Sequence, residues 1–452
     1  MAQAAPHHDL RMRITNRQIL GMMLPISFGI LVPQLNFITN NIFLGRLSEQ
    51  SLATAAITGV YYLIFAAIGF GLNNGLQALI ARRAGENRAD EIGVLFIQGV
   101  GIAMGIAVIG ILLTYTISPF ILKFSIHDEV IRTQAVAFLK IRIWGLPFLY
   151  IYQMRNALLV GTNQSRYLVA GTLAEASSNV LFDYALIFGH FGLPAMGFNG
   201  AAIASIIAEF LGMAVVFMVI HYKGISKRFS LFSNIKYDAK NTKLILVQSS
   251  PLIFQHAISI ISWEFFYILI EHHGERDLSI SNTMRNIFGL FGMFSWAFAA
   301  TCNSMVSNII GQGLQHRVVE LIIKIVKVST GIAVIICLLL NLFPVAFLSI
   351  YGQNQDWVEH AVPVVRVVSG ALVLMSFSVV WLSAVTGTGN TKVNLLIEFV
   401  TICLYCTYVW VVLEVMNMSI IMGWLSEWLY WSSMFTMSYL YIRSGKWKGK
   451  VI

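Results

Sequence analysis

The feature that most constrains this chain is the recurrence of long apolar stretches along its whole length. Of its 452 residues, 57% are hydrophobic and only 11% are charged, and its mean hydropathy is +0.73. Soluble domains carry about 25% charged residues, whereas about 20 apolar residues in a helix cross the hydrocarbon core of a bilayer. Because lipid offers no hydrogen bonds to the backbone, such stretches fold as helices. We therefore expect an all-α integral membrane protein.

Twelve stretches reach the length of a membrane span. They are residues 17–43, 52–80, 92–116, 135–159, 167–189, 198–221, 243–271, 279–307, 319–348, 361–385, 392–414 and 418–442. Lys and Arg gather in alternate loops, which the positive-inside rule places in the cytoplasm together with both termini. The net charge of +9 follows this topology, and its basic residues form no patch interleaved with exposed aromatics. We therefore predict twelve transmembrane helices and no nucleic-acid partner.

The chain repeats itself with a constant shift of 226 residues. The shift aligns Pro25 with Pro251, Gly85 with Gly311, residues 135–140 with 361–366, and "VGTNQSR" from Val160 with "TGTGNTK" from Thr386. Each repeat holds six spans, so both repeats enter the membrane with the same orientation. Such parallel repeats are related by a pseudo-twofold axis along the membrane normal.

The repeat predicts the domain organisation. We expect two six-helix bundles, an N-terminal lobe at residues 1–222 and a C-terminal lobe at residues 243–452. A basic, polar cytoplasmic linker at residues 223–242 joins them. A cavity between two such lobes is the arrangement that secondary transporters use.

The stretch "NVLFDYALIFG", residues 179–189, places Asp183 inside a predicted span. An acid at a helix centre in lipid costs about 2.5–3.5 kcal/mol, so such residues face a cavity or a partner. Glu175 and Asn179 lie eight and four residues before Asp183 and share its helix face. The first span contributes the amides of Gln34, Asn36, Asn40 and Asn41. We interpret Asp183 as a carboxyl that loads and releases a cation; the alternative is an acceptor that only joins helices.

The second half contains a further pair of charged residues within spans. Glu264 lies mid-span among aromatic residues, which suits a proton site or a counter-charge for a cationic substrate. The alternative is an ion pair between Glu264 and Arg285 that joins two helices. Asn282, near the outer end of the same span as Arg285, either binds or bridges. Glu209 and Glu398 are weaker candidates.

The sequence offers no motif for other chemistry. It contains neither a G-x-x-x-x-G-K-[ST] phosphate loop nor an H-E-x-x-H metal motif. "CLYC", residues 403–406, lies in an apolar span without a second pair, so its thiols are expected to pack as small hydrophobes. We predict a protein that is not an enzyme, with no catalytic residues and no metal centre. We expect no cofactor, only H⁺ or Na⁺ as the coupling ion.

Several motifs together resemble the multidrug and toxic compound extrusion (MATE) transporters, bacterial branch, over nearly the whole chain. "NVLFDYALIFG" followed by "MGFNGAAIAS" is similar to the family's N-x-x-x-D signature and its G-A-A-x-A-[ST] run. "RRAGENR" and "IIGQGLQ" resemble its paired cytoplasmic turns, and "GTGNTK" its turn after the tenth span. The resemblance implies a cation site at Asn179 and Asp183, with Ser205 at the family's Ser or Thr position.

The chain departs from the family pattern at three acidic positions. The family's first-span acid is replaced by Asn40, and the seventh-span Glu of the sodium-coupled branch by Ser259, five residues before Glu264. The tenth span has no acid near Met375. Our candidate cation-coupling residues are Asp183, Asn179, Asn40, Ser205 and Glu175. Our candidate substrate or counter-charge residues are Glu264, Arg285, Asn282 and Gln34.

These observations predict a secondary active antiporter that exports amphipathic, cationic drugs or toxic compounds in exchange for H⁺ or Na⁺. We expect a lipid-embedded monomer in the bacterial cytoplasmic (inner) membrane, working by alternating access between its lobes. One alternative is a flippase of the same superfamily for lipids or lipid-linked oligosaccharides, with cations from Arg142, Arg155, Arg285 and Arg366. The other is a passive channel or a non-transporting receptor. The substrate and the coupling ion stay open.

Overall fold

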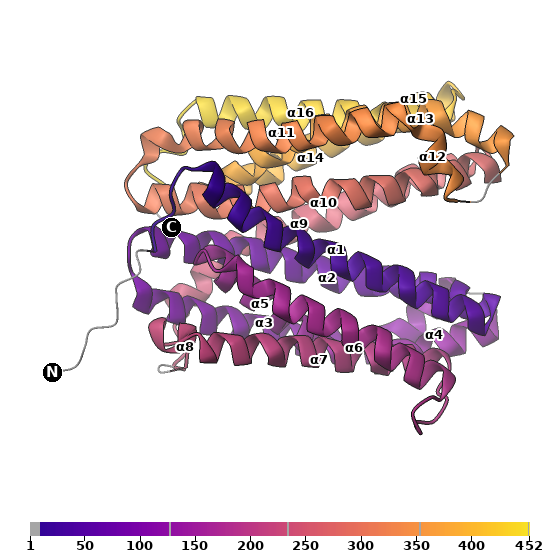
Figure 1. The fold of residues 1–452 in the computed structure, drawn as a ribbon, viewed down its shortest axis with the longest axis horizontal. Coiled ribbons are helices and arrows are strands. Elements are labelled where there is room, and N and C mark those ends of the chain that lie inside the picture. Colours follow the sequence, from indigo (N-terminus) through magenta and orange to yellow (C-terminus); the bar gives the residue numbers. More distant parts are fainter. Residues whose placement is uncertain (1–9, 126–127, 233–234, 352–353, 451) are drawn as a thin grey trace. The chain divides into compact units, whose positions relative to one another are not determined.

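The computed structural model describes residues 10–125, 128–232, 235–351, 354–450 and 452, and in these residues every regular element is helical (Figure 1). The long helices are α1 (Asn16–Leu47), α2 (Glu49–Gly85), α3 (Ala89–Ser125), α4 (Glu129–Arg142), α5 (Leu146–Gly161), α6 (Leu168–Phe188), α7 (Phe198–Tyr222), α9 (Ala239–Glu271), α10 (Glu275–Gly311), α11 (Val318–Leu342), α13 (Gln355–Gly387), α14 (Thr391–Val409) and α16 (Ser426–Arg443). Three helices are short: α8 (Ile225–Arg228), α12 (Pro344–Ser349) and α15 (Ile420–Trp424).

The predicted spans all fall on helices. Ten helical stretches of the described residues are long and apolar enough to cross a membrane by length and composition. Helix α6 and the pair α15 and α16 occupy the other two predicted spans, residues 167–189 and 418–442. The prediction of an all-α membrane protein is therefore confirmed.

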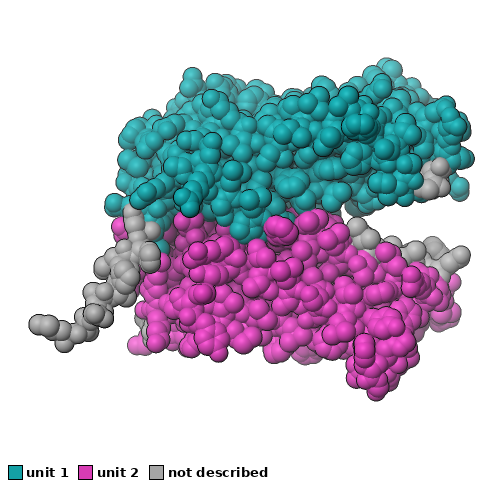
Figure 2. All heavy atoms as spheres, viewed as in Figure 1, with its two compact units in different colours: residues 1–27, 254–452 teal, residues 28–253 magenta. Residues whose placement is uncertain are grey.

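The chain divides into two compact units whose boundaries lie inside helices. Unit 2 is residues 28–253, and unit 1 is residues 1–27 with residues 254–452 (Figure 2). One boundary therefore falls within α1 and the other within α9. The two boundaries are 226 residues apart, which is the shift of the sequence repeat. Each of these two helices begins in one unit and ends in the other.

Hydrogen bonds explain why the first residues belong to unit 1. The backbone N–H of Met12 donates to Asn308 Oδ1 at 2.9 Å, and Asn308 Nδ2 donates to the carbonyl of Leu10 at 3.2 Å. Gln312 Nε2 donates to the carbonyl of Met12 at 3.0 Å. The segment before α1 is thus fastened to the end of α10, because the side chains there satisfy its backbone groups.

Close backbone approach explains why the first half of α9 belongs to unit 2. A Cβ on Gly71 would lie 2.6 Å from Ile253 Cα, and one on Gly75 would lie 2.3 Å from Ser249 Oγ. Only glycine leaves room for α9 against α2 at these positions. The packing here extends unit 2 to residue 253.

The segment predicted to be a linker packs against unit 2. Gln98 of α3 donates from Nε2 to the carbonyl of Lys236 at 2.8 Å and accepts from the backbone N–H of Asp238 at 3.2 Å. A Cβ on Gly93 would lie 2.1 Å from the carbonyl oxygen of Phe229. The described residues of this segment, 223–232 and 235–242, thus fall within unit 2. The division into lobes at 1–222 and 243–452 stays a prediction.

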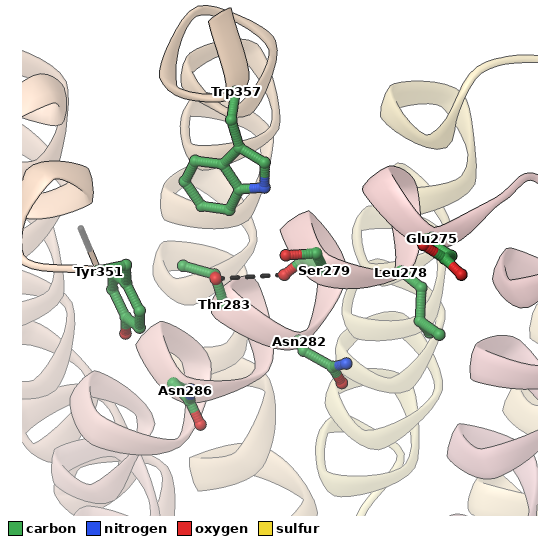
Figure 3. A pocket seen from close by; sticks show the side chains of 8 residues that line it. All are labelled: Glu275, Leu278, Ser279, Asn282, Thr283, Asn286, Tyr351 and Trp357. Carbon is green, nitrogen blue, oxygen red and sulfur yellow. Dashed lines mark hydrogen bonds between the residues drawn. The ribbon is translucent and has the colours of Figure 1, made fainter. Parts of the chain in front are cut away.

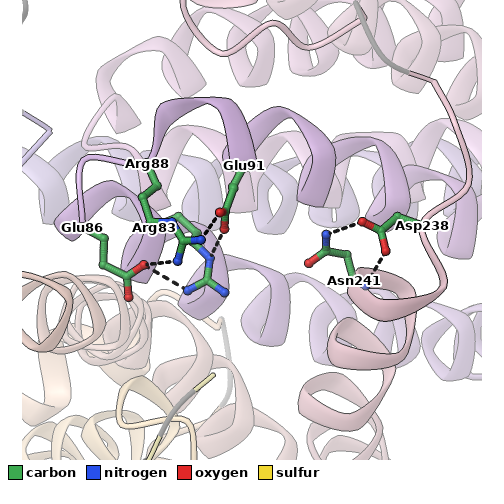
Figure 4. A network of polar contacts seen from close by, with 6 residues as sticks. All are labelled: Arg83, Glu86, Arg88, Glu91, Asp238 and Asn241. Atoms are coloured by element: carbon green, nitrogen blue, oxygen red, sulfur yellow. Dashed lines mark hydrogen bonds and ion pairs between the residues drawn. The ribbon is translucent and has the colours of Figure 1, made fainter.

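Charged residues order the turn between α2 and α3, which contains "RRAGENR" (Figure 4). Arg83 pairs with Glu86 at 3.2 Å and with Glu91 at 2.8 Å, and Arg88 contacts the same two acids. Nearby, the Asp238 carboxylate accepts the backbone N–H groups of Lys240 and Asn241 and so caps α9. Hydrogen bonds from Asn241 lower the pKa of Asp238, since they stabilise its charged form.

Candidate functional site

Asp183 is an acid without a hydrogen-bonding partner in the interior of unit 2. Its side chain on α6 is 0% exposed, and neither of its carboxylate oxygens accepts a hydrogen bond from the described residues. An ionised carboxylate in such a position is costly unless it is protonated or binds a cation. The binding of one positive charge would therefore offset the cost of burying the Asp183 carboxylate.

Asn179 lies one helical turn before Asp183 and faces α7. Its Nδ2 donates to Ser205 Oγ at 3.4 Å, while its own buried Oδ1 has no hydrogen-bonding partner among the described residues. The predicted proximity of Asn179 and Ser205 is thus present in the structure. Because Oδ1 is unused, an acceptor oxygen is available one turn from the acid.

Helix α1 packs alongside α6, and both run in the same direction. A Cβ on Gly29 would lie 4.0 Å from Thr172 Oγ1. Further along both helices, the ring of Phe43 is 6.5 Å from that of Tyr184 and 5.9 Å from that of Phe188. These contacts fix the register between the two helices.

The same offset places two amides of α1 level with residues of the seam. The offset that pairs Gly29 with Thr172 also pairs Asn40 with Asp183 and Asn36 with Asn179. The Oδ1 atom of Asn40 is buried without a hydrogen-bonding partner. The role of Asn40 at the cation site stays a prediction. Gln34, in contrast, has an exposed side chain.

Glu175 lies in the seam between α6 and α7. A Cβ on Gly212 would lie 2.8 Å from Glu175 Cβ and 3.3 Å from its Oε2, so the two helices approach closely here. Antiparallel pairing of Asn179 with Ser205 places Glu175 one turn further along the same seam. The stripe predicted on one face of this helix is therefore a polar seam.

A second acid of this seam, Glu209, is neutralised by an arginine. Arg142 donates from Nη1 to Glu209 Oε2 at 3.0 Å and from Nη2 to the other oxygen, and its guanidinium lies 3.9 Å from the Tyr62 ring centroid. A Cβ on Gly145 would lie 2.3 Å from Arg142 Nη1, where α4 gives way to a 3₁₀ turn. Glycine at this turn leaves space for the pair.

In unit 1 the predicted candidates Glu264 and Arg285 pair with each other. Arg285 Nη2 lies 3.2 Å from Glu264 Oε1, and the two side chains are 36% and 42% exposed. The guanidinium also lies 3.9 Å from the Tyr267 ring centroid and 5.1 Å from that of Trp263. The interhelical ion pair considered from sequence is thus the arrangement found.

Asn282 lines a pocket on the first half of α10 (Figure 3). The pocket has a volume of about 400 Å³. Its lining residues are Glu275, Leu278, Ser279, Asn282, Thr283, Asn286, Tyr351 and Trp357. Trp357 is buried, and its Nε1–H finds no hydrogen-bonding partner among the residues that the structure describes. One acid, two amides and two aromatic rings suit an amphipathic cation with an acceptor group.

Two buried acids in unit 1 were underrated or missed from sequence. Glu398, ranked as a weak candidate, is 1% exposed and accepts from Ser259 Oγ at 2.6 Å. Glu427, which was not considered, is buried and accepts from Trp431 Nε1 at 3.0 Å. The available signal was an acid inside a span with neither Lys nor Arg three or four residues away.

Long apolar helices enclosing a buried polar seam define a multi-pass membrane protein. The family model MatE matches residues 25–185 and residues 251–411, which together exceed half of the chain. The two matched segments are themselves displaced by 226 residues, so they coincide with the repeat. The chain belongs to the MatE family of transporters, as its motifs predicted.

Named relatives and solved structures resemble the chain. The probable multidrug resistance protein NorM of Thermotoga maritima is 21% identical over 440 residues, covering 96% of this chain and 94% of the relative. The protein of the same name from Halalkalibacterium halodurans is 29% identical over about half of each chain.

The likeness to solved structures extends over nearly the whole fold. An outward-facing multidrug resistance MATE family transporter of the MOP superfamily gives a TM-score of 0.88 at 16% identity over 98% of both chains. A MOP superfamily transporter from Pyrococcus furiosus gives a TM-score of 0.87 at 15% identity, covering 98% of this chain and 99% of that one. At such identities the likeness supports the fold alone.

Proposed function

We propose that this protein is a multidrug exporter that works as a secondary active antiporter, with Asp183 as the carboxyl that exchanges H⁺ or Na⁺. Transport is the activity of its family, and multidrug resistance is in the names of its relatives. The substrates we propose are amphipathic cations, and the setting is the bacterial cytoplasmic membrane, with the protein acting as a monomer.

The observation that carries the proposal is the unpartnered carboxyl of Asp183. A proton neutralises it directly. Na⁺ would instead be held by hard oxygen ligands, and the unused Oδ1 atoms of Asn179 and Asn40 are of that kind. Ser205 Oγ lies at Asn179 and adds a further oxygen. The same residues therefore serve either ion, and a gradient experiment decides between them.

The exchange of one charge supplies enough energy for export. One pH unit is worth about 1.4 kcal/mol, and 100 mV is worth about 2.3 kcal/mol per charge. For a neutral substrate the two together sustain a gradient of roughly a few hundredfold per proton, whereas for a monovalent cation exchanged one for one the electrical contributions cancel and one pH unit sustains about tenfold. One carboxyl that exchanges a proton is therefore sufficient to drive export of either kind of substrate.

Helix α1 offers a route from cation binding to alternating access. Its second half, which carries Asn40, belongs to unit 2, whereas its first residues belong to unit 1. A cation that draws Asn40 toward Asp183 acts on a helix that both units share. Cation binding thus favours one packing of α1 over another. A ligand shifts a conformational equilibrium only if it interacts differently with the two conformations.

The flippase alternative needs unpaired cations to hold a pyrophosphate. Arg142 is paired with Glu209, and Arg285 is paired with Glu264. Arg155 is buried, with its guanidinium 3.9 Å from the Tyr152 ring centroid and 3.3 Å from the carbonyl oxygen of Gly212. Since these arginines already have partners, they favour the antiporter over the flippase.

The test is transport in liposomes containing the purified protein. Export of the fluorescent cation ethidium is followed under imposed pH and Na⁺ gradients, applied separately, for wild type, Asp183→Asn and the surface control Asp90→Asn. We expect gradient-driven export by wild type and Asp90→Asn, and none by Asp183→Asn. Export by Asp183→Asn at the wild-type rate would assign Asp183 a purely structural role. Movement of ethidium without any gradient dependence would instead indicate a channel.

A further inference from the structure

We propose that Glu398, together with Ser259, Gln255 and Tyr430, forms a second exchangeable proton site, located in unit 1. The existence of the site is independent of the proposed antiport, but its consequence for transport rests on that function. Glu398 comes from α14, Ser259 and Gln255 from α9, and Tyr430 from α16. Three helices that are distant in sequence thus meet at one carboxyl group.

Hydrogen-bond donors and burial act on the Glu398 carboxyl group in opposite directions. Ser259 Oγ donates to Oε1 at 2.6 Å, Tyr430 Oη donates to the same oxygen, and Gln255 Nε2 donates to Oε2 at 3.4 Å. These donors favour the charged form, whereas complete burial favours the neutral one. Among its described contacts Glu398 has no Lys or Arg, unlike Glu209 with Arg142. A small change in the donors therefore decides whether it holds a proton.

A second buried acid, Glu427, lies close to this site. The ring of Tyr430 is 5.6 Å from that of Tyr405 and 4.7 Å from that of Trp431, which donates to Glu427. Tyr405 is buried, and its hydroxyl lies near Ser426 and Glu427. A second buried acid and a second tyrosine hydroxyl thus adjoin Glu398 through an aromatic cluster. Such a cluster excludes water except along its polar atoms.

Helix α9 connects this site to the boundary between the units. Gln255 and Ser259 lie in the first turns of α9 after the boundary between Ile253 and Phe254. A shift of α9 against α14 removes two of the three donors from Glu398. The carboxylate then takes one proton from a hydronium ion: one O–H bond forms on Glu398, and one O–H bond of the hydronium breaks, which leaves water. Return of α9 restores the donors, and the same proton leaves to water.

The site is not a repeat copy of the Asp183 site. The 226-residue shift places Thr172 where Glu398 stands and Gly29 where Gln255 stands. Gly29 and Thr172 do face each other in unit 2, so the same helix contact exists in both halves. In unit 2, however, the acid lies three turns further along the helix, at Asp183. The two halves therefore carry their exchangeable acids at different depths.

The test begins with a direct measurement of protonation. Infrared spectra of the full-length protein in liposomes are recorded across a pH titration, and the C=O stretch of protonated carboxylic acids is followed. We expect a titrating band that is lost in Glu398→Gln and retained in Asp183→Asn and in the exposed control Glu359→Gln. Tyr430→Phe keeps the acid and removes one donor, so the band should persist to higher pH than in wild type.

Two infrared results would overturn the site. One is a set of spectra for Glu398→Gln that matches wild type at every pH. The other is an effect of Na⁺ at constant pH: Na⁺ removes the band from the wild-type spectrum, while the spectrum of Glu398→Gln does not respond to Na⁺. The site would then bind a metal cation. Tyr430→Phe guards against a folding defect, since it retains the carboxyl group and should still show the band.

Transport then links the site to function. In the ethidium assay we expect loss of pH-driven export by Glu398→Gln, while Glu359→Gln exports as wild type does. Wild-type export by Glu398→Gln would overturn the coupling of this site. Failure of the antiport proposal looks different: ethidium would then move in wild type without any gradient dependence, and the infrared band of Glu398 would be unaffected.

Discussion

Units 1 and 2 are built from the same repeat, yet they treat their buried acids in opposite ways. In unit 2 Glu209 is locked to Arg142, while Asp183 has no hydrogen-bonding partner. In unit 1 Glu264 is held by Arg285, while Glu398 is surrounded by donors from two other helices. The repeat thus determines the positions of the helices, whereas the chemistry of each half depends on individual substitutions.

The largest expected effect on stability comes from breaking the ion pair of unit 2. Arg142→Gln leaves the buried carboxylate of Glu209 uncompensated, which costs about 3–5 kcal/mol of unfolding free energy. The double variant Arg142→Gln with Glu209→Gln should recover much of this loss. Both are measured by denaturant unfolding in detergent. A single variant as stable as wild type would show that the pair does not support unit 2.

A smaller effect is expected where α6 and α7 touch. Gly212→Ala places a methyl group 2.8 Å from Glu175 Cβ, and such overpacking costs about 1–3 kcal/mol. The matched control is Gly101→Ala in α3, where a Cβ meets no atom within 4 Å. Thermal unfolding compares the two variants. Equal melting temperatures for both would contradict the close approach of the two helices.

The ion pair of unit 1 should matter much less than that of unit 2. Glu264 and Arg285 are 42% and 36% exposed, and such pairs contribute about 0–1 kcal/mol. Arg285→Gln is therefore expected to shift the unfolding free energy far less than Arg142→Gln in the same assay. A loss as large as that of Arg142→Gln would remove the distinction between the two halves.

The smallest effect concerns pH and the loop after α9. His272 Nδ1 lies 3.0 Å from Glu414 Oε2, and this hydrogen bond raises the pKa of His272. Because the folded value exceeds the unfolded one of about 6.5, the stabilisation is complete below that pH. It is lost as pH rises through the folded value. In His272→Gln the melting temperature should vary less with pH over this window. A variant whose melting temperature follows pH as in wild type would contradict the contact.

Much of the fold was predictable because membrane helices obey a length rule. Apolar stretches located all twelve helical segments, and a self-alignment found the repeat. The unit boundaries inside α1 and α9 were not predictable, because they depend on contacts such as Asn308 with Met12 and Gly75 with Ser249. These contacts join residues far apart in sequence and leave no local pattern.

The candidate site was predictable where its residues share one helix. Asp183, Asn179 and Glu175 follow helical spacing, and the contact with Ser205 was implied by a family motif. Glu398 was underrated because its donors come from α9 and α16, which no periodicity connects to α14. Gln34 has an exposed side chain, and its predicted role stays a prediction.

We propose above all that Asp183 couples cation movement to export. The most direct measurement follows the internal pH of liposomes with a trapped pH-sensitive dye while ethidium moves across the membrane, in wild type and in Asp183→Asn. If Asp183 is the coupling site, protons move opposite to ethidium in wild type, and neither protons nor ethidium move in the variant. Protons that still move against ethidium in Asp183→Asn would contradict it.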